Sequence, residues 1–252
     1  MSGHSKWSTI KHQKARNDAK RSQIFTKLTR EISVAARQGG ADREMNFRLR
    51  LAVDNARQNN MPLDNIERAI QRATGGGDGG PALDEVVYEG YTPGGAAVMA
   101  VALTDNRNRT ASEIRRAFER QNSKLGSGGS VAWQFEQKGV LTLEADPDRA
   151  EQIALEAIDI GAEDFDLDGS FLEIRCAPEK FEELRRGIEE QGITLTSAEV
   201  TMVSKTQTSL SDHDAEMTLR LLDRLEELDD VQRVYTNADF PTEVLERYRA
   251  AA

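Results

Sequence analysis

A glycine-rich break at residues 74–81 divides the sequence into two parts with different hydrophobic periodicity. Before the break, apolar residues recur at steps of three and four, which is typical of amphipathic helices. After it, short apolar runs bounded by turn residues alternate with helical segments, which indicates strands and helices. The break itself, TGGGDGGP, has the composition of a linker. The sequence therefore predicts a helical unit followed by α+β units.

Three helices are expected before the break. The first follows Ser22, a candidate N-cap, and ends at Gly39. The second covers NFRLRLAVDNARQNN, and Pro62 opens the third. We expect residues 1–78 to form a compact basic helical domain that carries an N-terminal arm.

The segment after the break predicts a sheet whose strands come from two separate stretches of chain. VVYEGYTPGGAAVMAVALT indicates two strands joined by a turn, followed by a helix with a capping box from Thr110 to Glu113 and by a strand at VAWQF. After residue 206 the tail contains a further helix and a short strand. We expect residues 79–138 and 206–252 to form one discontinuous α+β domain.

From residue 139 to 205 the expected elements follow the order βαββαβ. That order is typical of a ferredoxin-like unit with an antiparallel sheet. The predicted fold class is therefore α+β: an N-terminal three-helix domain and two mixed domains with antiparallel sheets, one of them ferredoxin-like and inserted into the other. The inserted unit is acidic, because residues 140–205 hold 17 Asp or Glu against 6 Lys or Arg.

Charge is segregated along the chain. The whole protein has a formal net charge of -10, yet residues 1–73 hold 15 Lys or Arg against 7 Asp or Glu. Such asymmetry within one chain is typical of a polyanion-binding end. Counterions released from phosphates would make that binding strong and sensitive to salt. A solvated basic face is the simpler alternative.

The candidate nucleic-acid contacts form two groups. The arm and first helix interleave cations with side chains that can stack on bases, namely His4, Lys6, Trp7, Lys11, His12, Lys14, Arg16, Lys20, Arg21, Lys27 and Arg30. The helix after the first strand pair adds a second basic surface, which comprises Arg107, Arg109, Arg115 and Arg116, extended by Arg120 and Lys124. For this second group, local pairing with Glu113 and Glu119 is an equally good interpretation.

No catalytic or metal site emerges from the sequence, and no cofactor is expected. DFDLDGSFLEIR matches the first half of a calcium loop, but its twelfth position is Arg175 where a bidentate glutamate is required. A β-hairpin turning at Asp168-Gly169 explains the same pattern better. The glycine-rich break lacks the Lys-Ser/Thr pair of a phosphate-binding loop. The single cysteine, Cys176, lies in a predicted strand and is expected to be buried.

Composition places the protein in the cytoplasm as a soluble chain. No apolar run approaches the roughly 18 to 20 residues that span a bilayer, so no membrane partner is expected. The basic start lacks the apolar segment of a secretory signal. A lone cysteine suits a reducing compartment. A weak dimer signal favours a monomer.

Several stretches, in this order along the chain, resemble the YebC/PmpR family: MSGHSKWSTIKHQKARNDAKRSQIFTKL, NMPLDNIERAI, YEGYTPGGAA, TDNRNRTASEIRRAF and GSVAWQFEQKG. The resemblance covers essentially the full chain and is highly specific. It implies a helical domain joined to two mixed domains, with no cofactor or enzymatic activity. It also marks the opening residues Gly3, His4, Ser5, Lys6, Trp7, Ile10, Lys11 and His12 as a family feature, although Gln13 stands where many members carry Arg.

The resemblance implies two competing functions. Family members are generally described as probable transcriptional regulators with DNA as the ligand. Relatives are instead linked to translation at the ribosome, including the synthesis of polyproline-containing chains, with ribosomal RNA as the ligand. We therefore expect a non-enzymatic nucleic-acid-binding regulator of gene expression. An enzyme using a cleft between the mixed domains, and an acidic module that binds a basic protein, are the alternatives from other classes.

Overall fold

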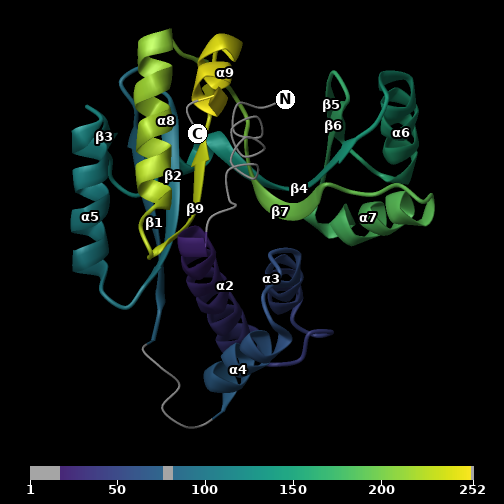
Figure 1. Cartoon of the computed structure of the whole chain (residues 1–252), viewed down its shortest axis with the longest axis horizontal. Coiled ribbons are helices and arrows are strands. Elements are labelled where there is room, and N and C mark those ends of the chain that lie inside the picture. The colour runs from purple at the N-terminus through teal and green to yellow at the C-terminus, as the bar shows by residue number, and fades with distance from the viewer. Residues whose placement is uncertain (1–17, 76–81, 251–252) are drawn as a thin grey trace.

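The structure, a computed structural model, describes residues 18–75 and 82–250. The three expected helices of the first part are α2 (Asp18–Gly39), α3 (Phe47–Gln58) and α4 (Leu63–Thr74), and they form the helical body below the rest of the molecule in Figure 1. Ile32, Leu49 and Ile66 are fully buried at its centre. The expectation for Ser22 was wrong, because α2 already includes the four residues before it.

The first sheet has the strand order β3-β1-β2-β9, with every neighbouring pair antiparallel. Its strands are β1 (Asp84–Tyr91), β2 (Ala97–Thr104), β3 (Lys124–Leu125) and β9 (Val231–Thr236). Strand β9 comes from the tail and pairs with β2. The chain thus leaves this sheet and returns to it.

Helices cover one face of the first sheet and complete what we call the first α+β body (Figure 1). They are α5 (Arg107–Arg120), α8 (Asp212–Glu226) and α9 (Thr242–Ala250), and a two-stranded parallel ladder of β8 (Thr208–Ser209) and β10 (Ala238–Asp239) lies beside them. Phe118 of α5 is fully buried against this face. Gly90 of β1 lies directly against the Phe118 ring, where a larger residue would collide.

The second sheet has the strand order β5-β6-β4-β7, again antiparallel throughout. Its strands are β4 (Phe135–Glu144), β5 (Asp164–Asp168), β6 (Phe171–Cys176) and β7 (Ser197–Ser204), and α6 (Pro147–Ile160), the 3₁₀ turn η2 (Pro178–Lys180) and α7 (Phe181–Glu190) complete this second α+β body. The chain order βαββαβ agrees with the sequence prediction; the ferredoxin-like assignment stays a prediction.

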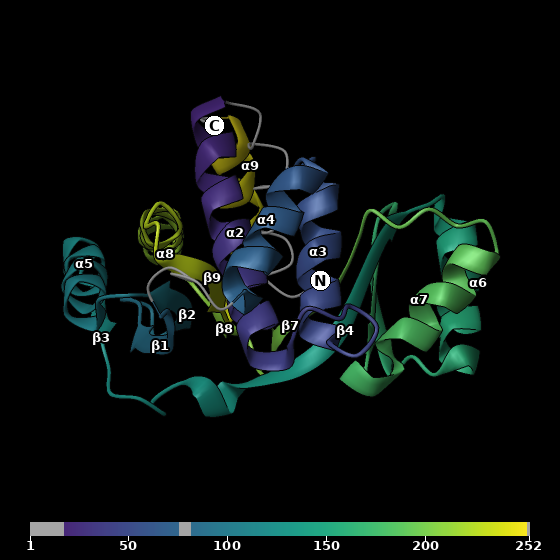
Figure 2. The same cartoon turned by 90° about the horizontal axis from the view of Figure 1, so that it is seen from below.

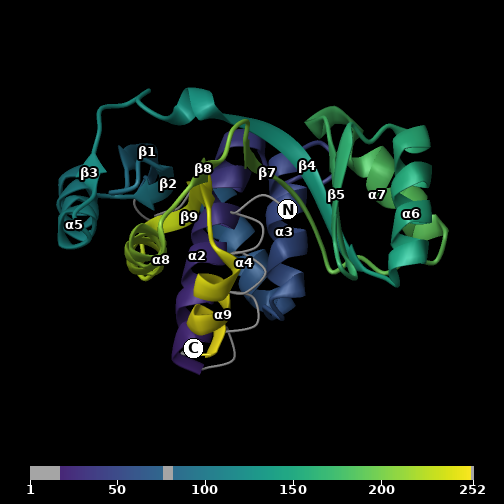
Figure 3. The same ribbon diagram turned by 90° about the horizontal axis from the view of Figure 1, so that it is seen from above.

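Strand β4 joins the two α+β bodies. Figure 3 shows β4 and β7 running from one body to the other, and the predicted boundary at residues 138 and 139 falls inside β4. The first residue of β4, Phe135, packs with Met99 and Tyr235 on the second face of the first sheet. The domain boundaries therefore remain a proposal, with β4 shared between two bodies.

The expected strand at VAWQF was wrong for every residue before Phe135. The 3₁₀ turn η1 (Ala132–Gln134) occupies that stretch, and β4 begins only at Phe135. The cause is the buried carboxylate of Glu89, which accepts hydrogen bonds from the backbone N–H groups of Gly129 (2.7 Å), Val131 (2.6 Å) and Ala132 (2.8 Å). These amides are consequently unavailable to a sheet ladder.

None of the helices within residues 18–75 and 82–250 is both long enough and apolar enough to cross a bilayer. Cys176 is fully buried, as expected from its strand, and burial raises the pKa of its thiol to about 11. A thiol with so high a pKa is a poor nucleophile at neutral pH.

Candidate nucleic-acid interface

The predicted arm contacts lie outside the described residues. These are His4, Lys6, Trp7, Lys11, His12, Lys14 and Arg16. Lys20 belongs to α2, but its side chain is also outside the description. Their role as nucleic-acid contacts stays a prediction.

Arg21 is exposed on α2, and its guanidinium carbon lies 5.4 Å from the centroid of the Phe25 ring. A cation held over an aromatic face remains open to solvent on its other side. Arg21 can therefore contact a phosphate without giving up this neighbour.

Lys27 and Arg30 face the first α+β body. The Lys27 Nζ donates a hydrogen bond to the Glu226 carbonyl oxygen at 2.6 Å, at the C-terminal end of α8. Arg30 donates to the Asp229 carbonyl and, at 2.9 Å, to Asp230 Oδ1. Both predicted contacts are thus engaged inside the protein.

Asp230, in the turn between α8 and β9, binds side chains from both α2 and α5. Its side chain is 4% exposed and binds Arg30 through one oxygen, while Arg109 (2.7 Å) and Thr110 (2.6 Å) donate to the other. Burial alone would raise the Asp230 pKa, but the hydrogen bonds and the positive charges around it outweigh that effect and lower it. Arg109 also binds Asp105 at 2.8 Å.

The interaction with Asp230 also corrects the expected capping box. Thr110 lies one turn inside α5 with its hydroxyl turned to Asp230, whereas Asn106 is the N-cap and accepts from the Arg109 N–H at 3.1 Å. Arg107 reaches back to β1 and pairs with Asp84 at 2.8 Å. This pair is largely exposed and contributes little to stability.

The outer face of α5 carries the available cations. Arg115 and Arg116 are exposed, and neither has an ion-pair or hydrogen-bond partner among the described residues. Ile114, Ala117 and Phe118 are buried on the opposite face of α5, which directs the arginines outward. Figure 2 shows α5 at one edge of the molecule, on the opposite side from α6 and α7. Exposed Arg120 and Lys124 extend this outward surface, which we call the α5 surface.

Trp133 is a candidate contact that the sequence prediction missed, because it was assigned to a strand. The residue is 67% exposed, and its indole N–H donates to the Ser130 carbonyl at 3.1 Å. Lys205 donates to the Trp133 carbonyl at 3.2 Å. An exposed indole beside a cation suits stacking on a base. The preceding glycine-rich GSGGS was the available signal that the ladder is interrupted here.

Two other polar sites do not favour a polyanion or a metal. A groove of about 490 Å³ between α3 and α7 is lined by charges of both signs, including Asp54, Arg57, Arg185 and Glu189. The calcium-like segment forms the β5–β6 hairpin, as predicted, and Arg175 occupies its acidic face at 3.1 Å from Asp164. Among the described residues, no group of three or more metal-binding side chains converges.

These features define an α+β protein with a helical body, two antiparallel sheets whose bodies are joined through β4, and an arginine-bearing helix directed outward. Comparison with known proteins agrees with that description. Residues 83–238 match the second and third domain of TACO1/YebC proteins, and residues 5–76 match the N-terminal domain of the same proteins. The chain belongs to the TACO1/YebC family.

Curated relatives align along the whole chain. A probable transcriptional regulatory protein of Dehalococcoides mccartyi is 48% identical over 252 residues, which is 100% of both chains. One from Rubrobacter xylanophilus is 51% identical over 97% of this chain and 98% of its own. Among solved structures, a conserved hypothetical protein from Aquifex aeolicus has a TM-score of 0.80 at 40% identity, covering 90% of this chain and 94% of that one. The α+β fold class and the family resemblance are confirmed.

Proposed function

We propose that the protein is a non-enzymatic regulator of transcription that binds DNA through its phosphate backbone. The observation that carries the proposal is the α5 surface. In a chain of net charge -10, Arg115 and Arg116 are exposed and unpaired within the described part of the molecule. The curated relatives are named as probable transcriptional regulatory proteins, which supports the same conclusion.

The mechanism is electrostatic. Each arginine that neutralises a phosphate releases a condensed counterion, so affinity falls steeply as salt rises. Contacts of this kind position a protein on a duplex without selecting a sequence. The arm of residues 1–17, with Lys6, Lys11, Lys14 and Arg16, would add further phosphate contacts from the N-terminal end of the chain.

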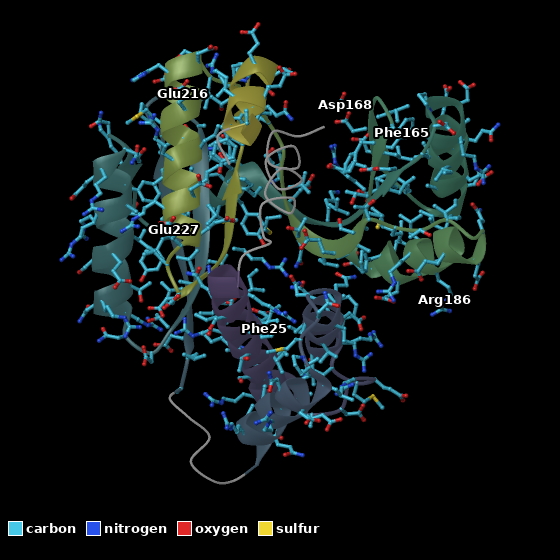
Figure 4. All side chains as sticks on the ribbon, viewed as in Figure 1. Phe25, Phe165, Asp168, Arg186, Glu216 and Glu227 are labelled. Carbon is cyan, nitrogen blue, oxygen red and sulfur yellow. The ribbon has the colours of Figure 1, made fainter. Side chains whose placement is uncertain are left out.

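The test compares two arginines of equal chemistry in different places. Arg116→Gln on α5 should weaken binding to a labelled 20-base-pair duplex about uniformly across sequences and reduce the salt slope by about one. Arg186→Gln on α7, an exposed arginine of the acidic second body labelled in Figure 4, should leave both unchanged. Fluorescence anisotropy over a range of salt concentrations measures both quantities.

Three outcomes would overturn the proposal. Binding that does not respond to salt would remove the phosphate mechanism. Equal losses for the two variants would show that α5 has no special role. A matched RNA bound at least tenfold more tightly than the duplex would replace DNA by RNA as the ligand.

A further inference from the structure

Three side chains on one side of α2 hold the end of α8. Gln23, Lys27 and Arg30 lie at steps of four and three, so they project from the same side of the helix. Gln23 donates to the Glu227 carbonyl at 2.6 Å and to Asp229 Oδ1 at 3.1 Å. With the contacts of Lys27 and Arg30 described above, these interactions form what we call the α2–α8 clasp. Figure 4 places Glu227 at the lower end of α8, close to the upper end of α2.

The acceptors in the clasp resemble a phosphate backbone in chemistry. They are backbone carbonyls at the C-terminal end of α8, where the helix macrodipole is negative, together with the Asp229 and Asp230 carboxylates. A nucleic-acid strand also offers oxygen acceptors spaced along a short path, and each of its phosphates carries a full negative charge that attracts lysine and arginine. The same donors therefore fit either partner.

The clasp joins two separate apolar cores. The buried apolar residues of the helical body form one cluster and those of the first α+β body form another, and polar atoms connect the two at this point. A second ion pair, Arg48 with Glu85 at 2.6 Å, is more than one-third exposed on both sides. The Gln23–Asp229 and Arg48–Glu85 contacts are exposed, so they are individually weak and screened by salt, whereas Arg30 binds a buried carboxylate. Elsewhere, Leu51 of the helical body packs against the apolar core of the second body.

We propose that Gln23, Lys27 and Arg30 form a phosphate-binding strip that the end of α8 keeps closed, and that DNA opens it by replacing the α8 oxygens. The helical body would swing away from α8 while Leu51 stays packed. This inference rests on the proposed function and adds a regulation to it. The apparent affinity is reduced by the fraction of molecules that are closed, so loosening the clasp should raise affinity.

The first experiment removes an acceptor and keeps the cations. Asp229 is exposed, so Asp229→Ala should fold normally. We expect it to bind the 20-base-pair duplex about three- to tenfold more tightly than the unmodified chain. The control is Asp148→Ala on α6, which removes the same charge from an exposed site in the second body. Equal gains for both variants, or no gain for Asp229→Ala, would overturn the clasp.

The second experiment observes the opening itself. Cysteines at Gln71→Cys on α4 and Glu246→Cys on α9 are both exposed and accept a pair of dyes, while native Cys176 is buried and stays unlabelled. Energy transfer should fall when the duplex is added. Unchanged transfer at saturating duplex would overturn the proposed movement.

The third experiment distinguishes the two roles proposed for these side chains, which are to hold the end of α8 and to bind phosphate. Lys27→Gln with Arg30→Gln should lower energy transfer in the free protein and also weaken duplex binding. Tighter binding by this variant would show that the strip holds no phosphate. If the unmodified chain did not bind the duplex in a salt-sensitive way, the proposed function itself would be wrong. If it did bind in that way but Asp229→Ala had no effect, only the clasp would be refuted.

Discussion

At the scale of single residues, the structure shows which cations are available and which are used internally. Lys27, Arg30 and Arg109 have protein partners, whereas Arg115 and Arg116 extend into solvent. The sequence predicted all five as nucleic-acid contacts from charge alone. It could not separate them, because Asp230, the partner that distinguishes Arg30 and Arg109, is more than a hundred residues away along the chain.

We expect the Asp230 carboxylate to make the free energy of unfolding fall in acid. Its lowered pKa means that the carboxylate stabilises the fold above the unfolded pKa of about 3.9, and that this contribution is lost as pH falls through the lower folded value. The charged groups facing it are Arg30 from α2 and Arg109 from α5, with Thr110 and Thr104 as hydrogen-bond donors. Asp230→Asn should lower the free energy of unfolding by about 2 kcal/mol at pH 7.

Urea denaturation at pH 7 and pH 3 checks this prediction. The difference between the unmodified chain and Asp230→Asn should shrink toward pH 3, because below about pH 3.9 the unfolded chain takes up a proton that the folded Asp230, with its lowered pKa, resists. A difference of the same size at both pH values would mean that the charge of Asp230 does not stabilise the fold.

We expect any larger residue at Gly90 to destabilise the first sheet through a steric clash. A Cβ at this position would overlap the Phe118 ring and the Lys124 carbonyl, both of which are held in place by packing or pairing. Gly90→Ala should destabilise the protein by about 2 kcal/mol. Gly128→Ala, where no atom lies within 4 Å of the new Cβ, is the control and should stay close to the unmodified stability in thermal denaturation.

At the scale of elements, periodicity predicted most helices and strands correctly, since their apolar faces are local properties of the sequence. Two of the failures occur where a group far along the chain binds a local backbone amide or side chain. Glu89 binds three amides some forty residues away and converts the start of VAWQF from strand to turn. The capping box failed similarly, because Asp230 binds the Thr110 hydroxyl.

The N-terminus of α5 gives a direct test of that correction. Asn106→Ala removes the observed cap and should lower the free energy of unfolding by about 1 kcal/mol. Glu113→Ala would be equally harmful if the predicted capping box existed, but the structure leads us to expect little change. Chemical denaturation of the two variants distinguishes the alternatives.

At the scale of the whole molecule, charge is separated between bodies. The second body is strongly acidic, while the arm of residues 1–17 holds four Lys or Arg and no Asp or Glu. Opposite charges on different parts of one molecule orient it as it approaches a polyanion. The acidic body would be kept away from DNA while the basic end is drawn in.

Removing the arm should therefore change salt dependence more than stability. Deletion of residues 2–17 ends immediately before α2 and leaves the described helix intact. The slope of log affinity against log salt should fall by up to about four, one for each lost cation. An unchanged slope would show that these cations do not touch phosphate.

The pairing of β4 with β7 has a consequence for how the second body is attached. They leave and re-enter the first body as paired neighbours, with Phe135 opposite Ser204, so the second body hangs from a two-stranded ribbon. A domain insertion is tolerated where the two ends of the inserted segment lie close together. A short hairpin loop between β4 and β7 could therefore replace the second body without moving the two points at which the ribbon meets the first body.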